Sequence, residues 1–270
     1  MKKTFVAYPY IAWMLLFILL PIIIVVVAAF YSDGVFSVVN FLRCFEPAYL
    51  KVFGYSLLTA LYCTILCVLL GYPVAYILAS KLFKHKNVLL FLIVAPMWMN
   101  FLLRTYAWMA ILERNGILNN VLSFFNLPQT DLLFSNGALL MGLVYNFLPF
   151  MILPIYTSLS KMDKSVIEAA RDLGANGFKV FMRVVLPLSL PGVFSGITMV
   201  FMPTVTTFVV SRLLGGGQNA LIGDIIEYQF SVGNNRAFGA ALSLVLMILV
   251  LATMSLTSKH EQENAQGGLF

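Results

Sequence analysis

A short charged segment interrupts an otherwise apolar chain at residues 161–192, KMDKSVIEAARDLGANGFKVFMRVVLPLSLPG. Its charged side chains are Lys161, Asp163, Lys164, Glu168, Arg171, Asp172, Lys179 and Arg183. Ser165 followed by Glu168 has the spacing of a capping box, in which each side chain accepts a hydrogen bond from a backbone N–H group of the other residue. Gly174 is of the type that ends helices in the left-handed conformation. The segment therefore predicts a helix of about two turns that ends at Gly174.

The apolar residues of this short helix share one face. Val166, Ala169, Ala170 and Leu173 follow the i, i+3, i+4, i+7 spacing of a helical contact stripe. A helix of this length is marginal in water, so we expect it to be docked on another surface. The periodicity alone leaves two interpretations open, namely an amphipathic connector on a lipid surface and a helix that docks into a partner protein.

Polar and aromatic side chains inside the apolar stretches form a second group of candidates. Polar groups at membrane depth are costly and mark functional sites, and aromatic faces attract amines. The candidates for a substrate path are Trp98, Asn100, Tyr106, Trp108, Tyr145 and Asn146, with Asp224 and Glu227 in the loop before the last apolar stretch. The alternative for each aromatic residue is ordinary packing at an interface, and for the two acids a solvated loop. Arg104 would repel a cation, so we expect it to reach outward or to pair with Glu113.

Patterns for metal or nucleotide binding are not found. Cys63 and Cys67 lie one helical turn apart in an apolar run, and Cys44, His85 and His260 are isolated, so no metal-ligand spacing arises. The glycine-rich stretch GGGQNALIG lacks the Lys-Ser/Thr ending of a phosphate-binding loop. We therefore expect neither a metal site nor a nucleotide site on this chain.

The composition requires a membrane around these candidates. Of the 270 residues, 61% are hydrophobic and only 10% are charged, and the mean hydropathy is +0.92, whereas soluble domains are about one quarter charged. Stretches of about 20 apolar residues are long enough to span a bilayer. Six are predicted, at residues 11–30, 56–80, 88–112, 137–159, 188–212 and 237–257. The first is too long for a cleaved signal peptide, so we expect it to be retained.

The distribution of charge orients these spans. If the N-terminus is cytoplasmic, the inner side carries eleven Lys and Arg against five Asp and Glu, and the outer side carries six of each. The positive-inside bias therefore absorbs the whole net charge of +6, and no nucleic-acid partner is needed. Both termini and the charged helix are expected on the cytoplasmic side.

The charged segment resembles the EAA loop of the permeases of ABC importers. That pattern is Glu-Ala-Ala, three residues, Gly, nine residues, Ile, one residue and Leu-Pro. Here Glu168, Ala169, Ala170, Gly174, Leu186 and Pro187 fall at the matching positions, with Val184 in place of Ile. The stretches LLGYPVAYILA, LVYNFLPFMILPIYTSLSKMDKSVIEAARDLGA and GGGQNALIGDIIEYQF are similar to the B-type permease subunits of spermidine/putrescine importers, and the similarity covers most of the chain.

The resemblance implies an all-α integral membrane protein with the type I ABC importer permease fold, in which residues 1–270 form one permease domain and 163–187 the EAA loop. It implies a transport subunit of the bacterial cell membrane and not an enzyme. The implied partners are a second, C-type permease subunit, two copies of a cytoplasmic ABC ATPase, an extracytoplasmic polyamine-binding protein and membrane lipid. No cofactor would bind this chain, because ATP and Mg²⁺ belong to the ATPase. The coupling residues would be Ser165, Glu168, Ala169, Ala170, Leu173, Gly174, Leu186 and Pro187.

Three alternatives remain beside this expectation. An importer of the same class could carry ferric ion, sulfate, molybdate or phosphonate, which the loop motif does not distinguish. A proton-driven carrier would predict inverted repeats and a buried acid within a span, and neither is visible. A structural scaffold would not need the loop spacing.

Overall fold

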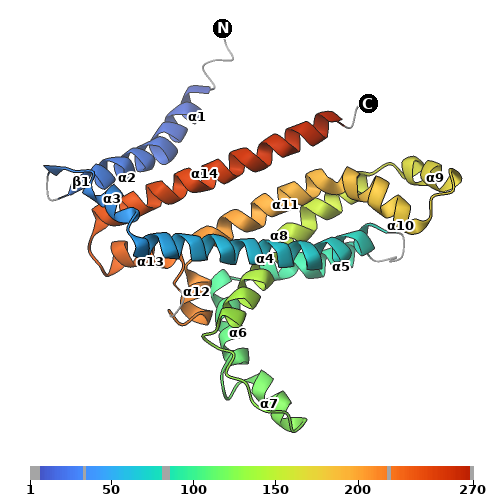
Figure 1. Ribbon diagram of the computed structural model, residues 1–270, viewed down its shortest axis with the longest axis horizontal. Coiled ribbons are helices and arrows are strands. Elements are labelled where there is room, and N and C mark those ends of the chain that lie inside the picture. The colour runs from blue at the N-terminus through green and yellow to red at the C-terminus, as the bar shows by residue number, and fades with distance from the viewer. Residues whose placement is uncertain (1–6, 33–34, 81–85, 218–219, 268–270) are drawn as a thin grey trace.

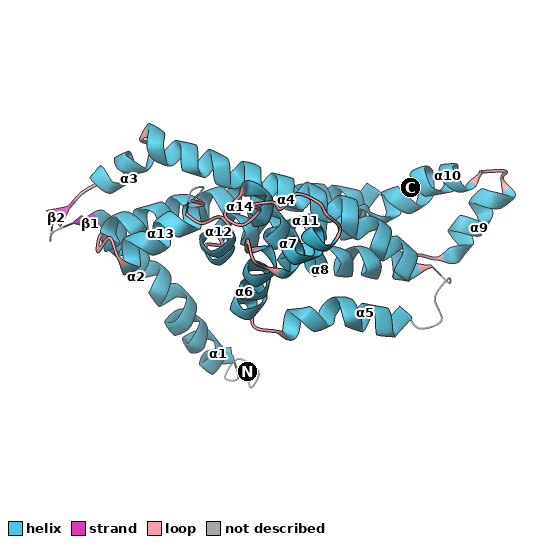
Figure 2. Ribbon diagram, turned by 90° about the horizontal axis from the view of Figure 1, so that it is seen from below, coloured by secondary structure: helices cyan, strands magenta, loops and turns pink. Residues whose placement is uncertain are grey.

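The computed structural model describes residues 7–32, 35–80, 86–217 and 220–267, and these are almost entirely helical (Figures 1 and 2). The expectations that rest on Lys2, Lys3, Lys81, Lys84 and His85 lie outside the described residues. Five helices are long and apolar enough to cross a membrane, and a sixth span is added if one sharply bent helix pair is counted as one. The described chain is thus a multi-pass membrane protein.

Three long helices form the core, namely α4 (Pro47–Ala79), α8 (Asn136–Lys161) and α11 (Leu186–Thr206). Small residues let them approach closely, as expected where helices pack without a hydrophobic driving force. A Cβ atom added at Gly192 would lie 2.7 Å from the Pro154 carbonyl oxygen, and one added at Gly196 would lie 2.6 Å from Met151 Sδ. Met151 is fully buried between Gly196 and Gly71 of α4. The glycines therefore set the separation of α8 and α11.

The N-terminal helix contributes little to this core. It consists of α1 (Ala7–Met14), a π-helical turn (Leu15–Leu19) and α2 (Leu20–Phe30). In its spanning part, Pro9–Phe30, no residue of the most apolar 18-residue stretch is buried. A short antiparallel hairpin, β1 (Tyr31–Ser32) and β2 (Val35–Phe36), joins it to α3 (Val39–Cys44). α14 (Arg236–Gly267) packs against α2, α3, α11 and α13, forming a second apolar cluster.

The predicted span 88–112 is not one continuous helix in the structure, because it is broken between Trp98 and Phe101. The chain forms α5 (Lys86–Val94) and a 3₁₀ turn (Ala95–Trp98), and then α6 (Phe101–Leu112) and α7 (Ile117–Phe124). The two parts meet at an angle of 95°. Pro96 lies in the 3₁₀ turn, and the Asn100 side chain caps the new helix by accepting hydrogen bonds from Leu102 N at 2.9 Å and Leu103 N at 3.4 Å. α6 and α7 therefore leave the direction of the bundle (Figure 1).

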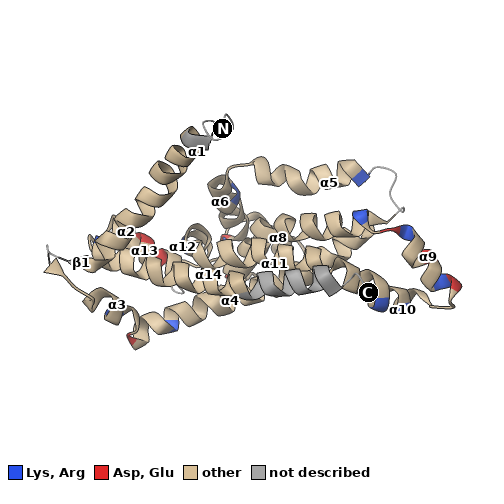
Figure 3. Cartoon of the chain, turned by 90° about the horizontal axis from the view of Figure 1, so that it is seen from above, with Lys and Arg blue, Asp and Glu red and all other residues tan. Residues whose placement is uncertain are grey.

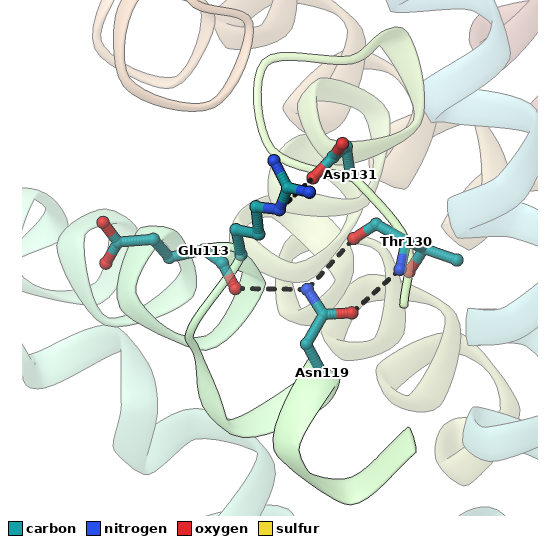
Figure 4. A network of polar contacts seen from close by, with 5 residues as sticks. Glu113, Asn119, Thr130 and Asp131 are labelled. Atoms are coloured by element: carbon teal, nitrogen blue, oxygen red, sulfur yellow. Dashed lines mark hydrogen bonds and ion pairs between the residues drawn. The ribbon is translucent and has the colours of Figure 1, made fainter. Parts of the chain in front are cut away.

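A polar network holds the segment around α7 together (Figure 4). The fully buried Asn119 donates from Nδ2 to the carbonyl oxygens of Glu113 (3.4 Å) and Thr130 (3.0 Å), and its Oδ1 accepts from Thr130 N at 2.9 Å. Arg114 and Asp131 form an exposed ion pair beside it, at 3.9 Å. One buried amide thus joins the α6–α7 turn to the loop that leads to α8.

The predicted start of the fifth span at residue 188 is also wrong. A continuous helix runs over Gly177–Thr206 and comprises α10 (Gly177–Val180), a π-helical turn (Phe181–Val185) and α11. Pro187 is the second residue of α11 and lies ten residues inside this continuous helix. It offers no N–H group to a carbonyl of the preceding turn, and the wider π turn comes directly before it. Two short helices, α12 (Val209–Leu214) and α13 (Ile222–Ser231), follow α11.

Candidate functional site

The predicted charged helix is present as α9 (Lys164–Asp172), at one end of the long axis of the molecule (Figures 1 and 3). The predicted capping box of Ser165 and Glu168 is wrong, because the helix begins at Lys164, one residue before Ser165. Asp163 is the cap, and its Oδ1 accepts from Ser165 N at 3.0 Å. This hydrogen bond lowers the pKa of the Asp163 carboxyl. A carboxylate at this end also interacts favourably with the helix dipole.

The opposite end of α9 closes as the sequence predicts. Gly174 has a φ of +82°, in the left-handed region. Its N–H donates to the Arg171 carbonyl oxygen at 2.8 Å, and the Ala175 N–H donates to the Ala170 carbonyl oxygen at 3.1 Å. These two bonds form a Schellman motif. The helix is therefore defined at both ends by its own residues.

The predicted apolar face of α9 is divided by the structure. Val166, Ala169 and Leu173 are exposed, and Leu173 is 89% exposed. Ala170, by contrast, is half-buried and packs with Ile167 against the main core cluster. α9 thus rests on its own domain along one edge and presents a second apolar edge, Val166–Ala169–Leu173, outward.

The chain folds back after α9. Asn176 caps α10 by accepting from Lys179 N at 2.9 Å. This cap is not among the predicted features, although Asn before Gly is a recognisable start signal. Leu186 and Pro187, the last residues of the motif, lie within the long helix that follows. The motif thus comprises an exposed, capped helix and the first part of a continuous helix that belongs to the core.

The candidates for a substrate path lie in different environments, from fully buried to largely exposed. Asn100 is engaged as the cap of α6, and Asn146 is fully buried, with Nδ2 donating to the Gly142 carbonyl oxygen at 2.8 Å. Trp98 is 75% exposed, and Tyr106 is exposed as well. Trp108 and Tyr145 pack against each other, with ring centroids 5.2 Å apart.

Arg104 does not behave as the sequence predicts. It is buried, at 7% exposure, so it does not reach outward. Its Nε and Nη1 atoms have no hydrogen-bond partner among the described residues, and Glu113 is exposed and forms no ion pair with it there. The guanidinium lies 5.7 Å from the centre of the Phe101 ring. This contact replaces the expected ion pair.

The acids Asp224 and Glu227 lie on a helix, α13, and not in a loop. Glu227 forms an ion pair with Arg212 of α12. Asp224 accepts from Leu221 N at 2.8 Å and is half-buried. Its burial raises the pKa of its carboxyl, against the lowering effects of the nearby Ser211 hydroxyl and of the Leu221 N–H group. Both acids therefore hold α12 and α13 in place.

The three cysteines are free and buried. Within the described ranges there is no group of three or more His, Cys, Asp or Glu side chains that could hold a metal ion.

The described helices form a bundle of membrane-spanning helices with one exposed, capped helix at its end, which defines a multi-pass membrane protein. The chain belongs to the family of binding-protein-dependent transport system inner membrane components, whose model matches residues 68–261. It is 39% identical to the spermidine/putrescine transport system permease protein PotB of Escherichia coli K12 over 249 residues, which cover 89% of this chain and 90% of that protein. The protein of the same name from Haemophilus influenzae is 38% identical over 248 residues, which cover 88% and 87%.

The fold is that of known importers. A crystal structure of a bacterial ABC transporter that imports the acidic polysaccharide alginate superposes with a TM-score of 0.79 and 14% identity, over 97% of this chain and 96% of that chain. The predicted type I ABC importer permease fold is therefore confirmed.

Proposed function

We propose that this chain is a permease subunit of an ATP-driven importer of spermidine and putrescine, and that α9 is the helix through which a cytoplasmic ATPase drives it. The observation that carries the proposal is the geometry of α9, which is capped at both ends, rests on the core through Ile167 and Ala170, and presents an unpartnered apolar edge. The names of the relatives that share nearly the full length of the chain support the cargo.

In this proposal the chain catalyses no reaction. Two ATPase subunits hold ATP and Mg²⁺, a second permease subunit completes the translocation path, and an extracytoplasmic binding protein delivers the polyamine. Both termini and α9 are cytoplasmic. Trp98, Tyr106 and the Trp108–Tyr145 pair remain proposed contacts of the amine, because aromatic faces attract ammonium groups. Asn100, Asn146 and Glu227 are engaged within the chain, so they would position these elements.

The test of coupling uses Val166, which is 43% exposed on the outer edge of α9. Val166→Asp adds an acid to the first turn of the helix, where the dipole favours it, so α9 should persist while its apolar edge is lost. Leu127→Asp, at a 53% exposed loop residue away from α9, is the matched control. In proteoliposomes with the partner subunits, we expect Val166→Asp to abolish ATP-driven uptake of labelled spermidine and its stimulation of ATP hydrolysis, and the control to retain both.

Two results would contradict the proposal. In the first, unlabelled spermidine and putrescine fail to inhibit uptake by the wild-type transporter, while sulfate, molybdate, phosphonate or ferric ion inhibits it. The cargo would then be one of these ions and not a polyamine. The other is unchanged substrate-stimulated ATP hydrolysis in Val166→Asp, which would remove α9 from the coupling path.

A further inference from the structure

A groove of about 330 Å³ lies between α9 and the helix that follows it. Its floor consists of Ala170 and Ala175, which are half-buried, and Val180, which is 4% exposed. Leu173, Lys179 and Arg183 also line it, and Lys179 and Arg183 lie one helical turn apart. The groove exists because the Schellman turn and the Asn176 cap fold α10 back beside α9.

The groove carries positive charge without a counter-charge. No acidic residue lines it, and both of its basic residues are exposed. The ion pairs in the described parts of the chain are Arg114–Asp131 and Arg212–Glu227, so Lys179 and Arg183 are paired with no described carboxylate. Figure 3 shows that charged residues of both signs gather on α9 and α10, at the end of the apolar bundle.

The groove is continuous with the outward edge of α9, because Leu173 belongs to both. A protein that covers this edge and extends over the adjoining groove removes the Lys179 and Arg183 head groups from water. Removing an unpaired ammonium and an unpaired guanidinium from water is strongly unfavourable, and an opposite charge with good hydrogen-bond geometry offsets the cost. The occupant of α9 must therefore bring an acidic group to this place.

We propose that the groove binds a carboxylate side chain of the ATPase subunit, held by Lys179 and Arg183, with its aliphatic stem against Leu173 and Val180. The planar guanidinium of Arg183 suits bidentate contact with a carboxylate, and Lys179 adds a point charge. This inference rests on the proposed function, which places the ATPase on α9, and it adds the chemistry of a second contact beside the apolar edge.

The experiment compares two double variants that change the charge equally. Lys179→Glu/Arg183→Glu reverses the groove, whereas Lys161→Glu/Lys164→Glu reverses two exposed bases of the same segment that do not line it. Binding of the purified ATPase subunit is measured for the permease pair in nanodiscs of zwitterionic phosphatidylcholine, at low and high salt. We expect the groove variant to bind at least about tenfold more weakly and the control within about threefold of wild type, with a salt dependence that decreases only in the groove variant.

A neutral variant, Lys179→Met/Arg183→Met, keeps the apolar stems of both side chains, so the loss of the charge pair can be distinguished from misfolding caused by reversed charge. We expect this variant also to weaken binding at least about tenfold, because the ATPase carboxylate would then be buried unpaired. A reciprocal Asp→Lys or Glu→Lys substitution on the ATPase that restores binding to the groove variant identifies the partner residue. If both charge-reversed double variants weakened ATPase binding equally, the inference would be overturned, because the bases would then act by general electrostatic attraction and not through the groove. An effect seen only in discs of anionic lipid would overturn it in favour of a lipid phosphate.

The two proposals fail differently. A wild-type permease that does not bind the ATPase at all contradicts the proposed function. A wild-type permease that binds, with a groove variant that binds equally well, contradicts only the groove.

Discussion

The strongest prediction concerns Gly174, where the backbone alone sets the cost of a substitution. Its φ is +82°, and a Cβ atom added there would meet nothing within 4 Å. Gly174→Ala therefore meets no steric obstacle, and the whole penalty comes from holding an L-residue in the left-handed region, about 1–2 kcal/mol. Gly177 is the matched control, because a Cβ atom there also meets nothing within 4 Å and its φ is not positive.

The assay is hydrogen exchange at the two amides of the Schellman motif, those of residues 174 and 175, which donate to Arg171 and Ala170. A penalty of about 1–2 kcal/mol raises their exchange about 5- to 30-fold. Gly174→Asn should have a smaller effect, since Asn tolerates this conformation, and Gly177→Ala should have none. Exchange that is unchanged in Gly174→Ala, or raised equally by Gly177→Ala, would refute the view that backbone conformation ends α9.

Three further predictions follow from contacts elsewhere. Asp163→Ala removes the cap of α9 and should cost about 1 kcal/mol of helix stability, seen as faster exchange of the Ser165 amide, while Asp163→Asn should retain most of the protection. Gly192→Ala places a Cβ 2.7 Å from a carbonyl oxygen of α8 and should destabilise the bundle by about 1–3 kcal/mol in thermal unfolding in detergent, whereas Gly54→Ala, where a Cβ meets nothing within 4 Å, should be neutral or stabilising. The raised pKa of Asp224 means that the native state holds the proton more tightly than the unfolded chain does. The free energy of unfolding should therefore fall as the pH rises from 3.8 through the raised pKa. Asp224→Asn should remove that part of the pH dependence of the unfolding midpoint, and an unchanged profile would contradict the assigned burial.

The sequence predicts the local features of α9 well because they depend on neighbouring residues. The position of Gly174 follows from its residue type, and the existence of the helix from its periodicity. The start was misplaced because Asp163 and Ser165 are both good capping residues, and only the register of the folded chain decides between them. The division of the apolar face could not be predicted, since it depends on which edge of α9 meets the core.

For the membrane helices too, the sequence predicts local features better than contacts between distant residues. α8 was predicted within two residues of its ends, but the break before α6 was missed, although Pro96 and Asn100 are both recognisable signals. Asn100 was interpreted as a polar group facing a substrate, whereas the structure uses it to begin a helix. The burial of Arg104 and the ion pair between Arg212 and Glu227 depend on how distant parts of the chain pack together. No local sequence pattern predicts that packing.

The continuous helix Gly177–Thr206 has a mechanical consequence. Its 30 residues span about 45 Å, so one continuous helix connects the wall of the groove beside α9 to the short helices α12 and α13. A tilt of about 5° around its midpoint displaces each tip by about 2 Å in opposite directions. A small push on one surface of the membrane thus becomes an opposed movement at the other surface.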